Sequence, residues 1–384
     1  MCRPAAAGER LMPAVSRADT SVIGRWWWSV DRVTLLALGV LIGIGYVLAL
    51  AAMPGFSGRI TDPHTLAMIK QVVFLGLGGA LMLGISMFSL RQVKLAALGS
   101  GIVFFLLTGF TLVHGVEVDG AHRWISLPGF TIQPSEFLRP AFIIVSGWLI
   151  AESRRTPGFP GRRAALGLFL VTALLLKMQP DIGMTALFTL VVFAQFYLDG
   201  LEMRWVGVAA GVIVVAAIAA FLFIAHVHTR VELFLHPNKT NAYQAITALS
   251  AFGNGGLFGL GPGEGQVKHF LPDARADFVF AVAGEEFGLL FCGFIVLVFA
   301  AIVIRAMIRL LAEPDLFVVL AAGGLIVGFG LQAFVNMASA LSLIPTKGMT
   351  LPFISYGGSS VLAVAMQMGF LLALTRKRHR GDLA

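Results

Sequence analysis

The stretch 271–288 concentrates carboxylates in a chain that otherwise carries few charges. Its acidic residues are Asp273, Asp277, Glu285 and Glu286, and long apolar runs lie close by. A carboxylate at a boundary between water and apolar surroundings is suited to act as a general base. Residue chemistry does not choose between Asp273 and Asp277, and Asp277 also suits the N-cap of a helix. Glu285 and Glu286 lie about two helical turns further on, so we predict that they support the structure.

Two other segments carry basic residues that suit an anionic ligand. Arg123 can bind a phosphate while the neighbouring ring of Trp124 covers apolar substrate or lipid. The alternative is a pair that only anchors the chain at the membrane interface. Lys347, which precedes a glycine, suits a pyrophosphate. Its alternative is a lysine that reaches the membrane surface from an ordered turn.

Further polar residues are predicted to shape the structure around these groups. Ser135 suits the N-cap of a helix, and Glu136 follows where the positive end of that helix favours an acid. The glycine-rich segment 251–265 lacks the pattern of a nucleotide-binding loop. It is either a flexible loop or a segment that moulds around a large ligand. No His, Cys and Glu residues have the spacing of a zinc site.

The composition is that of a protein that crosses a membrane many times. Of its 384 residues, 58% are hydrophobic and 12% are charged, whereas about 25% are charged in an ordinary soluble domain. The net charge of +8 comes from Lys and Arg that lie between apolar runs. They form no continuous basic face, so we predict no nucleic-acid partner. The cysteines Cys2 and Cys292 do not predict a disulfide or a metal site.

The apolar runs predict an all-α polytopic membrane protein with about ten transmembrane helices. A span needs about 20 apolar residues, and it is helical because an open strand edge cannot lie in lipid. The predicted spans are 33–53, 71–90, 95–113, 135–151, 164–176, 182–197, 206–225, 281–303, 317–338 and 360–374.

The basic residues predict the orientation of these spans. They fall on one side if the spans alternate, which places both termini in the cytoplasm. The outer side then receives a large extracytoplasmic loop, 226–280, between helices 7 and 8, together with the candidate segments described above. Segment 1–32 is predicted as a disordered cytoplasmic tail with Trp26, Trp27 and Trp28 at the interface. Residues 33–375 form a single transmembrane domain, and 376–384 form a basic cytoplasmic tail.

The candidate motifs occur in a fixed order along the chain. They are Arg123-Trp124, Pro134-Ser135-Glu136, Gln179-Pro180-Asp181, Asp277-Phe278, Gly284-Glu285-Glu286, Lys347-Gly348, Leu351-Pro352 and Ser355-Tyr356-Gly357-Gly358-Ser359. Together with the glycine-rich segment, they resemble the SEDS family (shape, elongation, division and sporulation), from about the first span to the last. Segment 345–350 is more similar to the division members than to the elongation members.

This resemblance implies a ten-helix peptidoglycan glycosyltransferase. Such an enzyme polymerises lipid II, an undecaprenyl-pyrophosphate-linked disaccharide peptide, at the outer face of the bacterial inner membrane, here at the division septum. The resemblance implies Asp277 as the catalytic residue, which we assign as the base. It also implies a class B penicillin-binding transpeptidase and other divisome membrane proteins as partners. A divalent cation, Mg²⁺ or Mn²⁺, could share the stabilisation of the leaving group.

The predicted substrate contacts include Arg123 and Lys347 at the pyrophosphate. The full set is Arg123, Trp124, Gln179, Asp181, Lys347, Ser355 and Tyr356. Two positions depart from the family pattern. Arg275-Ala276 stand where the family has His-Thr before the aspartate, and Arg139 stands where it has Lys. The second change keeps the charge but alters its geometry.

Three other functions compete with polymerisation. A lipid II flippase is suggested by Lys177, Asp181 and Glu286, whose charges could line a path through the membrane. An elongation-type paralogue would carry out the same chemistry in another process. A divisome scaffold would bind and activate its transpeptidase without catalysing polymerisation.

Overall fold

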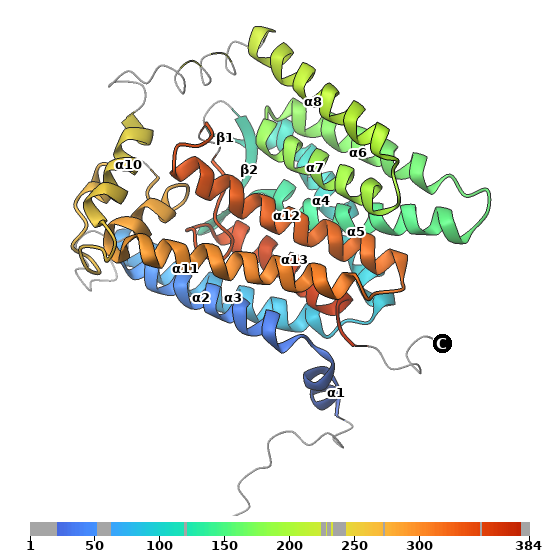
Figure 1. The fold of residues 1–384 in the computed structure, drawn as a ribbon, viewed down its shortest axis with the longest axis horizontal. Coiled ribbons are helices and arrows are strands. Elements are labelled where there is room, and N and C mark those ends of the chain that lie inside the picture. Colours follow the sequence, from blue (N-terminus) through green and yellow to red (C-terminus); the bar gives the residue numbers. More distant parts are fainter. Residues whose placement is uncertain are drawn as a thin grey trace, which may run out of the picture.

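The computed structural model describes residues 21–51, 63–118, 121–223, 228, 232, 243–271, 273–345 and 348–377. Long helices run side by side through the molecule (Figure 1). The helices are α1 (Val22–Ser29), α2 (Arg32–Ala51), α3 (Pro63–Ser86), α4 (Leu90–His114), α5 (Pro134–Arg155), α6 (Gly161–Met178), α7 (Ile182–Leu198), α8 (Met203–Phe223), α10 (Tyr243–Gly255), α11 (Val279–Leu310), α12 (Leu316–Ala340) and α13 (Gly358–Leu374).

All ten predicted spans fall on helices, namely α2 to α8 and α11 to α13. Five of them, α2, α3, α4, α11 and α12, are long and apolar enough to cross a membrane, and α7 and α13 are shorter apolar helices. The helical, polytopic membrane fold predicted from the sequence is confirmed. The number of helices that cross the bilayer and the side on which each terminus lies stay predictions.

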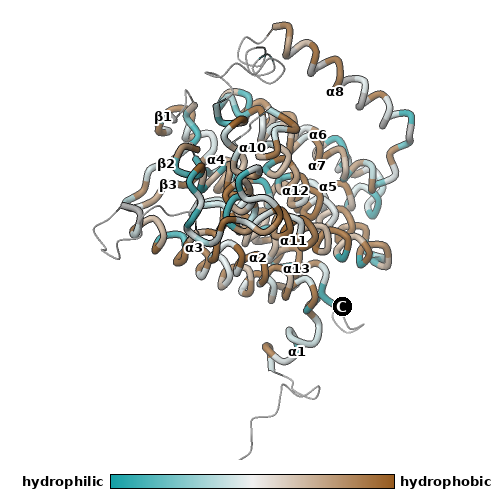
Figure 2. Tube along the Cα trace, turned by 60° about the vertical axis from the view of Figure 1, so that its left-hand side comes forward, coloured by the Kyte–Doolittle hydropathy of each residue, from teal (hydrophilic) through white to brown (hydrophobic). Residues whose placement is uncertain are grey.

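The centre of the bundle is built around α13. All residues of 359–374 except Leu362 are buried, because α3, α5 and α12 pack around this helix. In contrast, α8 lies at the edge of the molecule in both views (Figures 1 and 2). It is mostly apolar (Figure 2), and Trp205, Ile218 and Leu222 are exposed on it. Exposed apolar side chains of this kind are typical of a helix that faces lipid.

A small antiparallel sheet stands in the predicted loop between the third and fourth spans. It consists of β1 (Val116–Val118), β2 (Ala121–Leu127) and β3 (Phe130–Ile132), in the order β1-β2-β3. Gly129, with a φ of +89°, turns the chain between β2 and β3, a conformation that glycine adopts without strain. Lys70 Nζ on α3 donates to the carbonyl of Gly129 at 2.8 Å. The sequence reasoning did not predict this sheet.

The prediction of a disordered tail up to residue 32 is wrong for residues 22–29, which form α1. Ser21 caps this helix by accepting a hydrogen bond from the amide of Gly24 at 3.0 Å. Trp26 is buried, and its Nε1 donates to Ser86 Oγ at 2.9 Å. Burial of this large ring against the end of α3 stabilises an element whose short sequence alone is a weak helix signal.

The glycine-rich segment is fixed to α11, so the interpretation of a freely flexible loop is wrong for the described residues. The amides of Leu260 and Gly261 donate to the carbonyls of Glu285 and Glu286, at 3.0 and 2.9 Å. These carbonyls are available because α11 is interrupted at Gly288, which has a φ of +83°. The first residues of the segment, 251–255, form the end of α10, which packs on α11, and after the segment lies the short 3-10 helix η1 (Val267–His269).

Candidate functional site

Asp277 lies in a turn, 273–278, that leads directly into α11. The amides of Ala276 and Asp277 both donate to the carbonyl of Asp273, each at 3.0 Å. Asp273 is exposed and has a φ of +52°, a conformation that Asp tolerates better than most residues. Phe278 is the N-cap of α11, so the N-cap interpretation of Asp277 is wrong. The Asp277 side chain is half-buried at the end of the turn.

The loop before α13 binds two backbone carbonyls of this turn. The amide of Tyr356 donates to the carbonyl of Arg275 at 2.8 Å. The hydroxyl of Ser355 donates to the carbonyl of Ala276 and accepts a hydrogen bond from the amide of Leu351. Ser355 is 1% exposed. We therefore correct its predicted role from a substrate contact to a structural one.

Asn336 on α12 binds the third carbonyl of the turn. Its Nδ2 donates to the carbonyl of Asp277 at 2.9 Å and to that of Met349 at 2.6 Å. Because both partners are acceptors, the orientation of the amide is fixed by its contacts. Asn336 is 2% exposed, and its Oδ1 has no partner among the described residues. The sequence reasoning missed Asn336, although a polar residue within the apolar helix was a signal that could have identified it.

Gly348 lies against the carboxylate of Asp277. A Cβ added to Gly348 would lie 3.5 Å from Asp277 Oδ2, and the φ of Gly348 is +59°. Glycine therefore lets the chain pass close to the carboxylate in a left-handed conformation. Lys347, the predicted pyrophosphate contact that precedes Gly348, lies outside the described residues.

A small pocket lies beside the turn, and residues of α2 and α3 contribute to its lining. It is lined by Leu48, Ala49, Gln71, Arg275, Val279, Ile354 and Tyr356. The loop before α13 also contacts Gln71 on α3. Gln71 Nε2 donates to the carbonyl of Ser355 at 3.1 Å, and its Oε1 accepts from the amide of Gly357 at 3.3 Å. Tyr356 and Arg275 therefore flank one opening close to Asp277. The substrate contact of Tyr356 stays a prediction.

Arg123 belongs to a second cluster, which the sheet and the α6–α7 turn build together. Its Nε and Nη2 donate to the carbonyls of Gln179 and Pro180 at 3.3 and 3.2 Å. Its Nη1 lies 3.8 Å from Asp181 Oδ2. Trp124, the next residue on β2, is half-buried. Arg123 thus already has a carboxylate partner, which reduces the positive charge that it offers to a phosphate.

Gln179 and Asp181 hold this cluster together. The Gln179 side chain is 1% exposed, and its Nε2 donates to the carbonyl of Thr108 at 3.0 Å. Asp181 is the N-cap of α7, where its Oδ1 accepts from the amide of Met184 at 3.0 Å. Both side chains are therefore used inside the protein, and we correct their predicted substrate contacts to structural roles.

Ser135 and Glu136 lie at the start of α5. The predicted N-cap role of Ser135 is wrong, because α5 starts at Pro134 and Gln133 occupies the N-cap. Ser135 is buried and accepts a hydrogen bond from Gln133 Nε2 at 3.2 Å. Glu136 Oε2 accepts from Ser359 Oγ at 2.8 Å, which joins α5 to the start of α13.

Arg139, one turn beyond Glu136, is buried among three helices. Its Nη2 donates to Gln332 Oε1 on α12 at 2.6 Å and to Gln367 Oε1 on α13 at 3.0 Å. Gln332 Nε2 in turn donates to the carbonyl of Thr350 at 2.9 Å. The centre of the bundle is thereby connected to the loop that contacts the Asp277 turn.

From the first half of α11, the side chains of Glu285 and Glu286 bind residues 266–268, which directly follow the glycine-rich segment. The carboxylate of Glu285 accepts hydrogen bonds from three consecutive amides, those of Gln266, Val267 and Lys268, at 2.9, 2.8 and 3.0 Å. Glu286 forms a buried ion pair with Lys268, whose Nζ also donates to the carbonyl of Ala51 at 2.8 Å. These contacts agree with the predicted supporting role of both acids.

The described residues do not form a metal cage. No group of three or more His, Cys, Asp or Glu side chains gathers in the part of the chain that the structure describes. A resident Mg²⁺ or Mn²⁺ would need several oxygen ligands at short range. Asp277 alone does not fit that requirement, so no catalytic step is assigned to a metal.

Known proteins resemble this chain over almost its whole length. The family model described as "Cell cycle protein", which covers FtsW, RodA and SpoVE, matches residues 32–380. The protein named probable peptidoglycan glycosyltransferase FtsW from Caulobacter vibrioides is 40% identical over 95% of this chain and 94% of its own length. The protein of the same name from Methylomonas methanica is 32% identical over 90% of this chain and 92% of its own length.

Solved structures share the fold. One is a peptidoglycan synthase complex described as coordinating polymerization and crosslinking, with a TM-score of 0.74 and 25% identity over 91% of this chain and 98% of that chain. The rod shape determining protein RodA of Thermus thermophilus matches with a TM-score of 0.65 and 26% identity, over 91% of this chain and 97% of its own. The chain belongs to the cell cycle protein family of FtsW, RodA and SpoVE.

Proposed function

We propose that this protein is a peptidoglycan glycosyltransferase that polymerises lipid II at the outer face of the inner membrane during septal wall synthesis. The names of its relatives and the synthase complex with the same fold support this function. The observation that carries the catalytic assignment is the turn of Asp277. Its three consecutive carbonyls bind Tyr356, Ser355 and Asn336, and its carboxylate lies beside Gly348.

Asp277 acts as the general base in this proposal. The acceptor sugar hydroxyl attacks the anomeric carbon of a second lipid-linked sugar, and the bond from that carbon to the diphosphate breaks. Asp277 takes the proton that the hydroxyl loses, a role that typically contributes about 10²- to 10⁴-fold in rate. The turn supplies the fixed geometry that such a proton transfer needs.

Lys347 and Arg275 are the cations that we assign to the departing diphosphate. Lys347 precedes the glycine that lies beside Asp277, and Arg275 lines the pocket with Tyr356. Arg123, the other predicted contact, is paired with Asp181. A positive group placed where negative charge develops lowers the barrier.

A crosslinking transpeptidase of class B is the partner that we propose, at the division septum. The synthase complex with the same fold coordinates polymerization with crosslinking. Division is favoured over elongation because the FtsW relatives are 40% and 32% identical to this chain, compared with 26% for the RodA structure.

Substitution of Asp277 tests the catalytic assignment. We expect Asp277→Asn, purified with its transpeptidase and supplied with labelled lipid II, to form glycan at least about 10²-fold more slowly than the wild type. Asp273→Asn is the matched control, since it removes a carboxylate from the same turn at an exposed position where Asn fits the backbone. It should retain polymerisation. Glycan formation at the wild-type rate by Asp277→Asn would refute the base assignment, and transbilayer movement of lipid II without any polymer would favour the flippase.

A further inference from the structure

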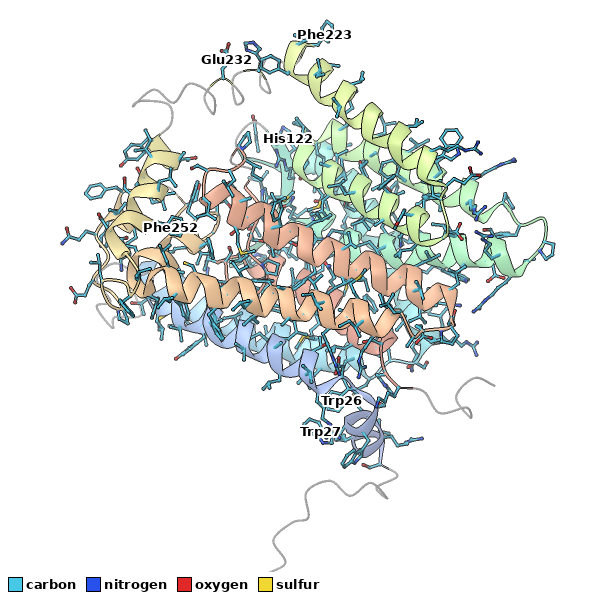
Figure 3. The ribbon with its side chains drawn as sticks, viewed as in Figure 1. Trp26, Trp27, His122, Phe223, Glu232 and Phe252 are labelled. Carbon is cyan, nitrogen blue, oxygen red and sulfur yellow. The ribbon has the colours of Figure 1, made fainter. Side chains whose placement is uncertain are left out.

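The outward side of α1 is an apolar surface. Its residues are Val22, Ile23, Trp27 and Trp28, which we call the α1 surface. Ile23 and Trp27 lie four residues apart and therefore share a helix face. The side chains of Trp27 and Trp28 are 36% and 37% exposed, whereas Trp26 is buried. Trp26 lies on the side of α1 nearer the bundle, and Trp27 lies farther out (Figure 3).

The α1 surface is held in place by contacts on its other side. The carbonyl of Ser29 accepts from the amide of Lys377 at 2.9 Å, and its hydroxyl accepts from Arg376 Nε at 3.1 Å. Arg376 also donates to the carbonyl of Met87 at 3.0 Å. Since the end of α1 is tied to the residues that follow α3 and α13, the exposure of Trp27 and Trp28 is a fixed feature of the fold.

The α1 surface is continuous with the lipid-facing side of α2. Only Val30 and Asp31 separate the two helices, and the first outward side chains of α2, Val33 and Leu36, are exposed. Because α2 spans the membrane, those side chains face lipid. In Figure 1, α1 projects sideways from the end of the bundle at which α13 also ends. Helix α1 therefore lies at the level of the membrane surface and does not extend away from the membrane.

The charge around the α1 surface is positive. The guanidinium of Arg32 lies over the rings of Trp27 and Trp28, 5.0 and 4.3 Å from their centroids. Arg25 on α1 is exposed. The acid between the two helices, Asp31, is buried and paired with arginines of α11. Tryptophan with arginine is the combination that binds at a lipid headgroup layer, and anionic lipids attract such basic segments.

We propose that the α1 surface binds the anionic headgroup layer of the leaflet in which α2 begins. Trp27 and Trp28 insert at headgroup depth, and Arg25 and Arg32 contact lipid phosphates. Stacking on the indole rings, and a hydrogen bond from Arg32 Nε to the carbonyl of Trp27 at 3.2 Å, keep the guanidinium beside the rings. Its Nη groups are the ones that we assign to a phosphate. This proposal does not depend on the proposed function.

Brominated lipids test the proposal, because bromine on an acyl chain near the headgroup quenches tryptophan emission on contact. The wild-type chain and the Trp27→Phe/Trp28→Phe double variant are placed in nanodiscs of phosphatidylcholine and phosphatidylglycerol, with either lipid brominated. We expect the double variant to lose less emission on bromination than the wild type. The difference in quenching between the wild type and the double variant should be larger when phosphatidylglycerol carries the bromine. Both rings are exposed, so the variant keeps the packing of Trp26.

Charge variants test the preference for anionic lipid. Arg25→Gln/Arg32→Gln should abolish the excess quenching by brominated phosphatidylglycerol, and Arg163→Gln, at an exposed position on α6, should leave it unchanged. Equal quenching of the wild type and the tryptophan double variant in every lipid would overturn the proposal and assign the α1 surface to another partner. Equal quenching by the two brominated lipids would overturn the preference for anionic headgroups.

Discussion

The position of Asp277 is set by hydrogen bonds to the backbone around its side chain. Three carbonyls in succession accept hydrogen bonds from an amide, a hydroxyl and a carboxamide, which come from two other parts of the chain. Each bond contributes only about 1 kcal/mol net. Together they limit the movement of the turn, and a catalytic group must be held within about 0.5 Å of its productive position.

Asn336 is predicted to position Asp277. Asn336→Asp keeps the shape of the side chain but places carboxylate oxygens against the carbonyls of Asp277 and Met349, which then lose their donor. We expect kcat for lipid II polymerisation to fall by roughly 10- to 100-fold, with a smaller change in KM, since a shift of about 1 Å can cost that much. Steady-state kinetics measure the changes in kcat and KM separately. A wild-type kcat in a folded Asn336→Asp protein would exclude the positioning role.

At the scale of elements, the interruption of α11 joins the glycine-rich segment to the helix that follows the catalytic turn. Gly288 takes a left-handed conformation, and the amide of Leu289 donates to the carbonyl of Gly256 at 3.0 Å. Upstream of the break, the carbonyls of Glu285 and Glu286 accept from amides of the same segment, and their carboxylates bind the residues that follow it. The break thus leaves backbone groups of α11 available for hydrogen bonds with the segment.

Gly288→Ala is expected to destabilise this junction strongly. An added Cβ would lie 2.3 Å from the carbonyl oxygen of Leu257, at a φ of +83°. Strain and overpacking together should cost about 2–5 kcal/mol. Gly293→Ala on the same helix is the matched control, because an added Cβ meets nothing within 4 Å there. Thermal unfolding in detergent compares the two, and equal midpoints would contradict the steric argument.

The stability of the junction between α2 and α11 is predicted to depend on pH. Burial alone would raise the pKa of Asp31, but hydrogen bonds from Arg305 and Thr34 and the charge of Arg309 hold that pKa below its ordinary value of 3.8. A lowered folded-state pKa means that the stabilisation is complete above pH 3.8 and is lost as the pH falls through the folded-state value. Asp31→Asn should therefore lower stability by about 1–3 kcal/mol at pH 7.

The difference between wild type and Asp31→Asn should shrink once the pH falls below 3.8, the ordinary pKa of the residue. Thermal midpoints of both proteins, measured from pH 7 down to pH 3, check this sign. A difference that stays constant over this range would show that the carboxylate charge contributes nothing at this junction.

At the scale of the whole molecule, the end of α1 and the residues that follow α13 meet at one end of the bundle. The amide of Lys377 donates to the carbonyl of Ser29, while α10 lies at the opposite end (Figure 1). The sheet and α10 are built from segments that were predicted to lie outside the membrane on one side. The side of the membrane on which each end of the bundle lies stays a prediction.

Cysteine labelling tests that orientation. In a Cys2→Ser background, where Cys292 is buried, Glu264→Cys in the glycine-rich segment should react with a membrane-impermeant maleimide in intact spheroplasts. Arg163→Cys at the start of α6 should react only after the membrane is opened. The reverse pattern would invert the predicted orientation and place Asp277 on the cytoplasmic side.

The sequence by itself determined where the helices run, because a span of about 20 apolar residues is a local property of the chain. Residue chemistry alone left Asp273 and Asp277 open, and only the resemblance of the motifs to a known family favoured Asp277. Even at this local level the sequence reasoning missed α1, whose stability comes from the burial of Trp26 against the end of α3. It also missed the sheet, whose strands are only three to seven residues long.

Only the tertiary structure decided what the polar side chains do. Asn336 reaches a carbonyl 59 positions away, and Arg123 reaches one 56 positions away. Gln179, Asp181 and Ser355 were predicted as substrate contacts, but the fold buries them, and Gln179 Nε2, Asp181 Oδ1 and Ser355 Oγ form internal hydrogen bonds. The physical reason is that a buried polar group must find a partner, and which partner lies within reach depends on how distant helices pack.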